Sequence, residues 1–220
     1  MLYEDRLAYT PMIPAEIHLP MYQDAVMQAL AWRRSALDGA LIEMAKRSDV
    51  LAEVATRLIT TLRTGRKALV AGNGGSAAEA QHFAAELVGR FKRERAPYAA
   101  LALTTDTSIL TAVANDYGYD DVFARQVLGL GQPGDMLIAF STSGSSENLV
   151  RAAVSGHERG MTVVAVTGDK PSKLAMAADL AVRVPLVDTA CVQELHLAVT
   201  HILCDIVEAE LAADEGVERQ

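Results

Sequence analysis

Two pairs of side chains in the 220-residue sequence have the types and spacing for acid–base chemistry or metal binding. His82 and Glu86 are four residues apart, so on a helix they project from one face. Gln193 and His201 are eight residues apart and also share one side of a helix. Imidazole nitrogens and carboxylate or amide oxygens can bind a divalent metal, and a carboxylate with an imidazole can act as base and acid toward a sugar. Either use requires the two helices to meet, and the alternative is that each histidine is structural.

Two turns rich in glycine and hydroxyl groups are typical of a phosphate site. They read AGNGGSAAEA over residues 71–80 and STSGSSEN over residues 141–148. Glycine lets the backbone approach a ligand, amides at a helix start receive an anion, and hydroxyls add donors. One such turn alone could be a tight connection with a helix cap. Two of them at the same edge of one sheet favour a ligand site.

The glycine-rich turn differs from the nucleotide-binding loops that it resembles. It lacks the lysine and Ser/Thr of a Walker loop, and Ala77 replaces the third glycine of a dinucleotide fingerprint. That fingerprint tolerates alanine, but it also expects an acidic residue about 20 residues further on. Asp106 lies well beyond that distance, after a complete helix and a basic loop. The sequence therefore disfavours a nucleotide ligand.

Short apolar runs separated by helical segments must position these side chains. The runs are nearly continuous in apolar residues, as in strands that are covered on both faces. They span residues 67–71, 99–103, 136–140, 162–167 and 180–184. The prediction is an α/β fold, a five-stranded parallel sheet with helices on both sides. Right-handed crossovers would bring the loops after the strands to one edge, where such sheets bind ligands.

Long helices are predicted on either side of this region. Residues 21–64 have helical spacing with a break near Ser48 and Asp49, either of which could cap the second helix. Residues 189–213 form a last helix that is apolar over much of its circumference, which indicates burial and, with the first helices, a subunit interface. Residues 1–20 contain three prolines and read as an irregular leader. We expect a single domain over residues 21–215 and a tail over residues 216–220.

Composition narrows the class of protein. The net charge of −8 argues against nucleic acid or an anionic membrane as a partner. Two cysteines are too few for a disulfide framework, and the first 20 residues do not resemble a signal peptide, so we expect a cytoplasmic protein. The basic tract of residues 90–95 is predicted to be a solvated connection after the helix. The alternative is that one of its cations binds an anionic ligand.

The motifs together resemble the phosphoheptose isomerase family, whose members are sugar-isomerase (SIS) domain enzymes. The resemblance rests on GNGGSAAEAQHFAAEL, LTTDTSILTAVANDYGYDDVFARQV, STSGSSEN, VVAVTG and the ending VP…DT…VQELH…H, and it runs from about residue 21 to residue 213. It implies a flavodoxin-like three-layer α/β/α sandwich with added N-terminal helices. It also implies a homotetramer with active sites between subunits, and conversion of sedoheptulose 7-phosphate to D-glycero-D-manno-heptose 7-phosphate through an enediolate.

The same resemblance assigns roles to individual residues. Glu86 would be the catalytic base and His201 its acid/base counterpart. One zinc ion per subunit would be bound by His82, Glu86, Gln193 and His201. The residues that would contact the substrate come from the two turns, the Asn-Asp pair and the catalytic helices: Asn73, Gly74, Gly75, Ser76, Glu86, Asn115, Asp116, Ser141, Thr142, Ser143, Ser146 and Gln193. This sequence departs from the family at Ala190-Cys191, where other members often have an arginine or another polar residue.

A non-catalytic alternative exists within the same fold. A branch of SIS-domain proteins that binds the bacterial replication initiator as a scaffold resembles this chain in LTTDTSILTAVAND, but it lacks the glutamate and the second histidine. Both Glu86 and His201 are present here, which favours the enzyme. A sugar-phosphate sensor would need a DNA-binding domain, and the N-terminal helices show no sign of one.

Overall fold

The computed structural model describes residues 19–214 and divides the chain into two compact units at Ser35. Helix α1, Leu19–Ala45, crosses this division, and the residues from Ala36 onward form the unit that contains the sheet. The predicted leader lies largely outside the described residues, as does the predicted tail. Helix α1 already includes Pro20, which is tolerated in a first helical turn because its missing N–H has no partner there. The single domain over residues 21–215 stays a prediction.

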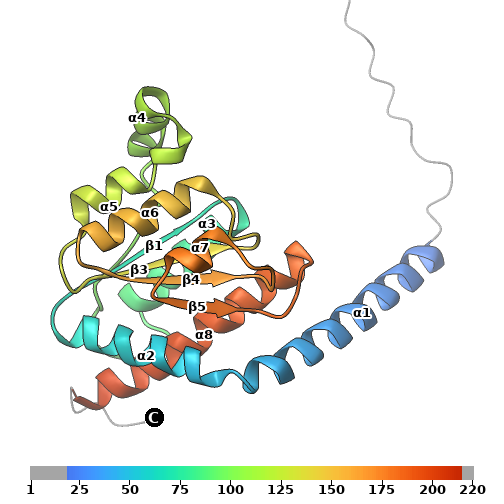
Figure 1. The fold of residues 1–220 in the computed structure, drawn as a ribbon. Coiled ribbons are helices and arrows are strands. Elements are labelled where there is room, and N and C mark those ends of the chain that lie inside the picture. The colour runs from blue at the N-terminus through green and yellow to red at the C-terminus, as the bar shows by residue number, and fades with distance from the viewer. Residues whose placement is uncertain (1–18, 215–220) are drawn as a thin grey trace, which may run out of the picture. The chain divides into compact units, whose positions relative to one another are not determined.

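The sheet has five parallel strands in the order β2-β1-β3-β4-β5 (Figure 1). The strands are β1 Ala68–Gly72, β2 Ala100–Ala102, β3 Met136–Ser141, β4 Thr162–Thr167 and β5 Leu180–Arg183. Every residue of β1 and β3 is buried, as their apolar runs predict. The predicted α/β fold with a five-stranded parallel sheet is confirmed.

Helices cover both faces of this sheet. The helices that follow α1 are α2 Ser48–Arg63, α3 Gly75–Val88, α4 Thr107–Tyr117, α5 Ala124–Leu130, α6 Glu147–Glu158, α7 Lys173–Ala177 and α8 Thr189–Asp214, with a short 3-10 turn η1 at Tyr119–Asp121. Side chains of α2, α3 and α8 pack in one apolar core with Val70 and Ile138. Side chains of α5, α6 and α7 pack in the other core with Leu69 and Leu137. Alternate residues of β1, β3, β4 and β5 thus supply the two cores, and Figure 1 shows α2 and α8 on one side of the sheet with α5 and α6 on the other.

The predicted break between the first two helices is confirmed at residues 46–47, but the predicted cap is wrong. Ser48 is the first residue of α2, and Arg47 occupies the capping position without a side-chain hydrogen bond to the helix. A serine or aspartate caps a helix only from the non-helical position before it, and here both residues have entered the helix.

Helix α8 is long and apolar enough over Thr189–Ala213 to cross a membrane by length and composition alone. Half of that window is buried within the fold, and its stripe of Val192, Leu195, Val199 and Leu203 is fully or almost fully buried in the core. The predicted burial of this helix is confirmed, and core helices commonly pass the same test.

Candidate active site

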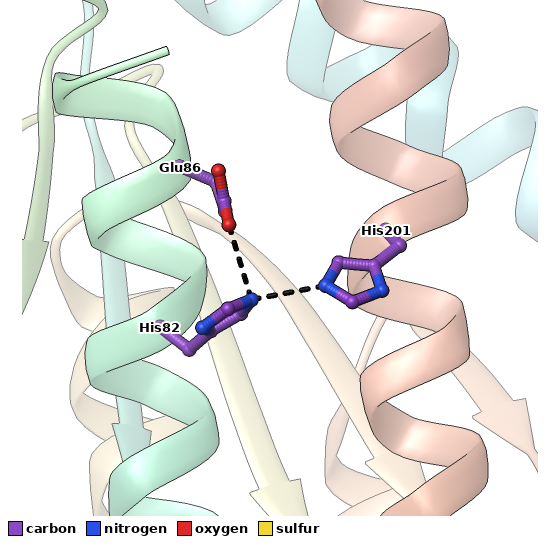
Figure 2. Close-up of side chains that lie close together, drawn as sticks. All are labelled: His82, Glu86 and His201. Atoms are coloured by element: carbon purple, nitrogen blue, oxygen red, sulfur yellow. Dashed lines mark hydrogen bonds and ion pairs between the residues drawn. The ribbon is translucent and has the colours of Figure 1, made fainter. Parts of the chain in front are cut away.

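His82, Glu86 and His201 converge from two helices into one cluster, which we call the acid–base cluster (Figure 2). The Nε2 atom of His82 lies 3.0 Å from Nε2 of His201 and 3.2 Å from Oε1 of Glu86. The first two side chains come from α3 and the third from α8, so the two helices meet as the pair of motifs requires. The side chain of Glu86 is 21% exposed and that of His82 is 41% exposed, so a ligand can reach both.

Helices α3 and α8 lie side by side and run in the same direction. Three contacts along them follow the same order in both sequences: Gly75 with Gln193, Glu79 with His196, and His82 with His201. A Cβ atom on Gly75 would collide with the side-chain amide of Gln193. Glycine at this position therefore lets the Gln193 side chain take its present place against the first turn of α3.

A cavity of about 200 Å³ lies at the carboxyl ends of β1 and β3. Predicted substrate residues from both turns and from α8 line it, together with Phe140 and Thr189, which were not predicted; the full lining is Asn73, Ser76, Phe140, Ser141, Thr142, Ser143, Ser146, Thr189 and Gln193. The structure thus brings the two turns to one edge of the sheet, as the parallel topology predicts.

The hydroxyl-rich turn folds so that its side chains support its own backbone. Ser141 Oγ accepts a hydrogen bond of 3.0 Å from the Gly144 amide, and Ser143 Oγ accepts one of 3.2 Å from the Ser145 amide. Gly144 has φ +62°, a conformation that side chains rarely adopt. Because both hydroxyls act here as acceptors, their O–H groups stay available to donate to a phosphate oxygen.

The side chain of Asn73 is held by two residues that the sequence did not single out. Its amide exchanges two hydrogen bonds with the amide of Asn148, at 3.0 and 2.9 Å, and its Oδ1 also accepts one of 3.0 Å from Tyr119. Asn148 is the last residue of STSGSSEN and is buried, so its position in that motif was the available signal. The two turns are therefore linked directly.

Asn115 and Asp116 do not line this cavity. They lie in the last turn of α4, a helix with no buried residue among those described, and both are exposed with a 2.8 Å hydrogen bond between them. Tyr119, which binds Asn73, is only three residues beyond Asp116. Their contact with substrate stays a prediction, as does that of Gly74, which is exposed and has φ +55°.

The acid–base cluster fits a zinc ion by donor type and spacing. Its ligand atoms, two imidazole nitrogens and one carboxylate oxygen, all lie within 4.8 Å of one another, and such donors are the ones zinc takes. Gln193, the fourth predicted ligand, instead has its amide against Gly75, about 12 Å along the helix axis from the level of His201. Gln193 as a zinc ligand stays a prediction.

The basic tract of residues 90–95 is not a simple solvated connection. Arg90 and Glu94 are exposed, but the side chain of Arg95 is 1% exposed and pairs with Glu208 of α8. The anionic partners of this tract within the described chain are thus carboxylates of the protein itself, and the prediction of a solvated loop is wrong for Arg95.

Comparison with known proteins agrees with this site. The SIS domain model matches residues 35–168. The chain is 50% identical over 184 residues to the phosphoheptose isomerase of a Bradyrhizobium species, covering 84% of this chain and 90% of that protein.

Two solved structures are also similar. The phosphoheptose isomerase of Francisella tularensis has a TM-score of 0.79 at 38% identity and covers 84% of this chain and 98% of its own. Phosphoheptose isomerase GmhA of Neisseria gonorrhoeae has a TM-score of 0.78 at 41% identity, and the match covers 86% of this chain and 99% of the Neisseria chain. The chain therefore belongs to the phosphoheptose isomerase family of SIS-domain proteins and is an isomerase that acts on sugar phosphates.

Proposed function

We propose that the protein interconverts sedoheptulose 7-phosphate and D-glycero-D-manno-heptose 7-phosphate. The observation that carries the proposal is the convergence of Glu86 and His201 from α3 and α8, together with a cavity lined by hydroxyl groups nearer the start of α8. An aldose–ketose isomerisation needs a base for a carbon-bound proton and a donor for the neighbouring oxygen, and these residues have those capacities. The relatives named above are phosphoheptose isomerases, which supports the choice of a seven-carbon substrate.

The phosphate of the substrate binds at the hydroxyl-rich turn. Ser141, Thr142, Ser143 and Ser146 line the cavity and offer O–H donors, and the first amides of α6 lie directly after them. Asn73 and Gln193 line the same cavity and are suited to hydrogen bonds with the sugar hydroxyls.

The reacting end of the sugar lies at the acid–base cluster. The Glu86 carboxylate removes the proton from the carbon next to the carbonyl, while His201 donates a proton to the carbonyl oxygen, giving an enediol. Glu86 then returns its proton to the neighbouring carbon, and His201 takes one from the other oxygen. His82 contacts both groups and holds them at hydrogen-bond distance.

The distance between the phosphate cavity and the acid–base cluster supports a long substrate. Gln193, at the cavity, and His201 are eight residues apart, or about 12 Å along α8. The six carbon–carbon bonds of an extended heptose span about 7.5 Å when each advances roughly 1.25 Å, given bond lengths near 1.5 Å. A heptose bridges this distance when the phosphate and carbonyl groups at its ends are included, whereas a three-carbon sugar phosphate does not.

A zinc ion, predicted at one per subunit, fits the acid–base cluster. His82, Glu86 and His201 would hold it, and Gln193 is the fourth ligand that the sequence predicts. When bound, it would supply a positive charge that stabilises the developing enediolate oxygen.

The proposal includes a homotetramer with active sites between subunits, in the cytoplasm and without a nucleic-acid or membrane partner. The exposed position of Asn115 and Asp116 supports shared sites, because a second copy could receive them. The large apolar side chains exposed on α1 support subunit contacts.

The direct test is to incubate the purified protein with sedoheptulose 7-phosphate, with and without added zinc, and to follow the aldose product by NMR. We expect the heptose 7-phosphate to accumulate to equilibrium. Absence of turnover under both conditions would exclude the proposed reaction.

The mechanism predicts a specific effect of Glu86→Gln. Turnover should fall by roughly a hundredfold or more, because the amide cannot accept the carbon-bound proton, while folding and the competitive inhibition constant of inorganic phosphate stay unchanged. Glu53→Gln, which alters an exposed carboxylate on α2, is the matched control and should keep parental turnover. Near-parental activity of Glu86→Gln would show that Glu86 is not the base.

A further inference from the structure

The loop that follows α3 is bound to α8 by one buried carboxylate. Both oxygens of Glu208 accept backbone hydrogen bonds, from Phe91 at 2.9 Å, Lys92 at 2.7 Å and Arg93 at 3.0 Å. The Glu208 side chain is 1% exposed. Three successive amides around one anion form a concave anion site, here filled by the protein's own side chain.

Arg95 balances this charge and fixes the last turn of α3. Its Nε lies 3.2 Å from Oε1 of Glu208. The two groups form an ion pair, but the Nε–H does not donate a hydrogen bond to this oxygen. Its Nη atoms donate to the carbonyl oxygens of Glu86 and Leu87, both at 2.8 Å, and of Gly89 at 3.0 Å. Carbonyls at a helix end have no partner within the helix, so the guanidinium group caps α3 at the backbone of Glu86 itself.

The same loop covers one face of His201. The ring of Phe91 stacks on the His201 imidazole with centroids 5.4 Å apart and planes 23° from parallel. The Phe91 amide is one of the three bound by Glu208, so the carboxylate fixes the backbone that carries this ring. The buried pair thus contacts the backbone of one member of the acid–base cluster and, through Phe91, the ring of another.

Stability alone does not account for such a pair. Two charges removed from water lose their solvation, and replacing a buried ion pair by apolar residues of similar volume is often neutral or stabilising. This pair contacts the Glu86 backbone directly and the His201 ring through Phe91, and small displacements at such groups have large effects on rate.

We propose that Arg95, Glu208 and Phe91 are positioning residues that hold Glu86 and His201 in the geometry for proton transfer. The inference rests on the proposed function of those two residues.

The first test is Glu208→Gln. Both oxygens of Glu208 accept hydrogen bonds, so a glutamine NH₂ group would face at least one amide donor and loosen the loop. We expect kcat to fall about tenfold with KM unchanged, because none of the described residues that line the phosphate cavity belongs to this loop and a misplacement of about 1 Å can reduce a rate by up to a hundredfold. A folded Glu208→Gln protein with parental kcat would overturn the proposal.

Asp205→Asn is the matched control. Asp205 lies one turn earlier on α8 and binds the same loop from outside, through Lys92 at 2.8 Å and Arg93 at 3.4 Å. The Asp205→Asn variant loses the same charge as Glu208→Gln, but the hydrogen bonds of Asp205 go to the side chains of Lys92 and Arg93 and not to the loop backbone, so its kcat should equal that of the parent. A tenfold loss in this control as well would overturn the specific role of the buried pair.

Phe91→Leu tests the proposal without disturbing the charges, and it applies even if Glu208→Gln does not fold. It should lower kcat several-fold at constant KM. It should also increase the rate at which diethyl pyrocarbonate modifies His201, measured by mass spectrometry against the exposed His157 as internal reference. Unchanged kcat together with unchanged His201 modification would overturn the proposal.

The rate of His201 modification also distinguishes failure of the proposed isomerase function from failure of the positioning role. If the parent protein does not isomerise sedoheptulose 7-phosphate, the proposed function fails, yet faster modification of His201 in Phe91→Leu still supports the positioning contact. If the parent is active and both variants match it in kcat, the proposed function stands and the positioning role fails.

Discussion

At the scale of single residues, His82 is the centre of the acid–base cluster. Its Nε2 lies within hydrogen-bond distance of both His201 and Glu86. One ring nitrogen carries at most one proton, so His82 can donate to only one of these neighbours at a time. When Nε2 of His82 carries a proton, it can donate to Glu86 or to His201; when it carries none, it can accept a hydrogen bond from His201.

Ser143 is expected to contribute to binding and not to the chemical step. A hydrogen bond to a charged group contributes about 1.5–3 kcal/mol, so Ser143→Ala should raise KM roughly tenfold or more at constant kcat. Steady-state kinetics with the heptulose phosphate measure both constants, and Ser108→Ala, an exposed serine of α4, is the control. A change confined to kcat would contradict the assignment of Ser143 to phosphate binding.

Cys204 is expected to be inert although it lies one turn from His201. Burial, reinforced by the negative charges of Glu86 and Glu208, raises the pKa of the Cys204 thiol to about 12. Below that pH the thiol stays protonated, and the thiolate is the reactive form. Because Cys191 is also buried, Ellman's reagent at about pH 8 should detect no thiol in the folded protein and both after denaturation. Rapid labelling of the native protein would show that this region opens.

At the scale of elements, the parallel contact between α3 and α8 creates the site. The spacing of His82 with Glu86, and of Gln193 with His201, predicts which side chains share a helix face, because that depends only on helix geometry. The register between two helices more than 100 residues apart depends on the packing of both against the sheet, which no local pattern contains. The sequence therefore identified the cluster residues but not the contact of Gly75 with Gln193.

The difference between local patterns and tertiary contacts also explains which other features the sequence predicts and which it does not. Apolar runs predicted the strands because all of β1 and β3 is buried. The mutual amide contact of Asn73 and Asn148, and the internal partner of Arg95, were missed because each joins segments far apart in the sequence. Tertiary contacts of this kind leave only weak local signals.

A side chain at Gly75 should weaken substrate binding, because it would occupy the space of Gln193 on the neighbouring helix α8. A methyl group on Gly75 would displace the Gln193 amide, so Gly75→Ala should raise KM at least several-fold with little loss of stability, since the displaced group is the flexible end of a side chain. In the control Gly129→Ala, the added methyl meets no atom within 4 Å, and alanine favours the helix there by up to about 1 kcal/mol. Thermal denaturation and kinetics of both variants check this, and parental kinetics in Gly75→Ala would show that Gln193 does not need its present position.

At the scale of the whole molecule, the first unit exposes a surface suited to assembly. Within residues 19–35 of α1, Tyr22, Val26 and Leu30 recur every four residues, and each is more than half exposed. Monomeric proteins rarely leave such a continuous apolar stripe in water. This supports the proposed tetramer, in which the stripe would be covered by other subunits.

A charge placed in this stripe should separate the subunits. Leu30→Glu is expected to reduce the mass measured by analytical ultracentrifugation and to lower activity, because the proposed sites lie between subunits. Gln28→Glu introduces the same charge at an exposed polar position of the same helix and should leave both unchanged. An unaltered mass for Leu30→Glu would exclude this stripe from the interface.

The cavity at the carboxyl ends of β1 and β3 is also the place where three helices begin. Helices α3, α6 and α8 start at or beside Ser76, Ser146 and Thr189, which all line it. Each helix start carries about half a positive charge from its aligned peptide dipoles, so together they supply roughly +1.5 toward a phosphate group of about −1.5 to −2. Among the described residues that line the cavity there is no lysine or arginine, and the protein has a net charge of −8. An acidic protein can thus complement a dianion with helix-start dipoles and neutral hydroxyl donors, through a field that is strong at contact and too short in range to attract other polyanions.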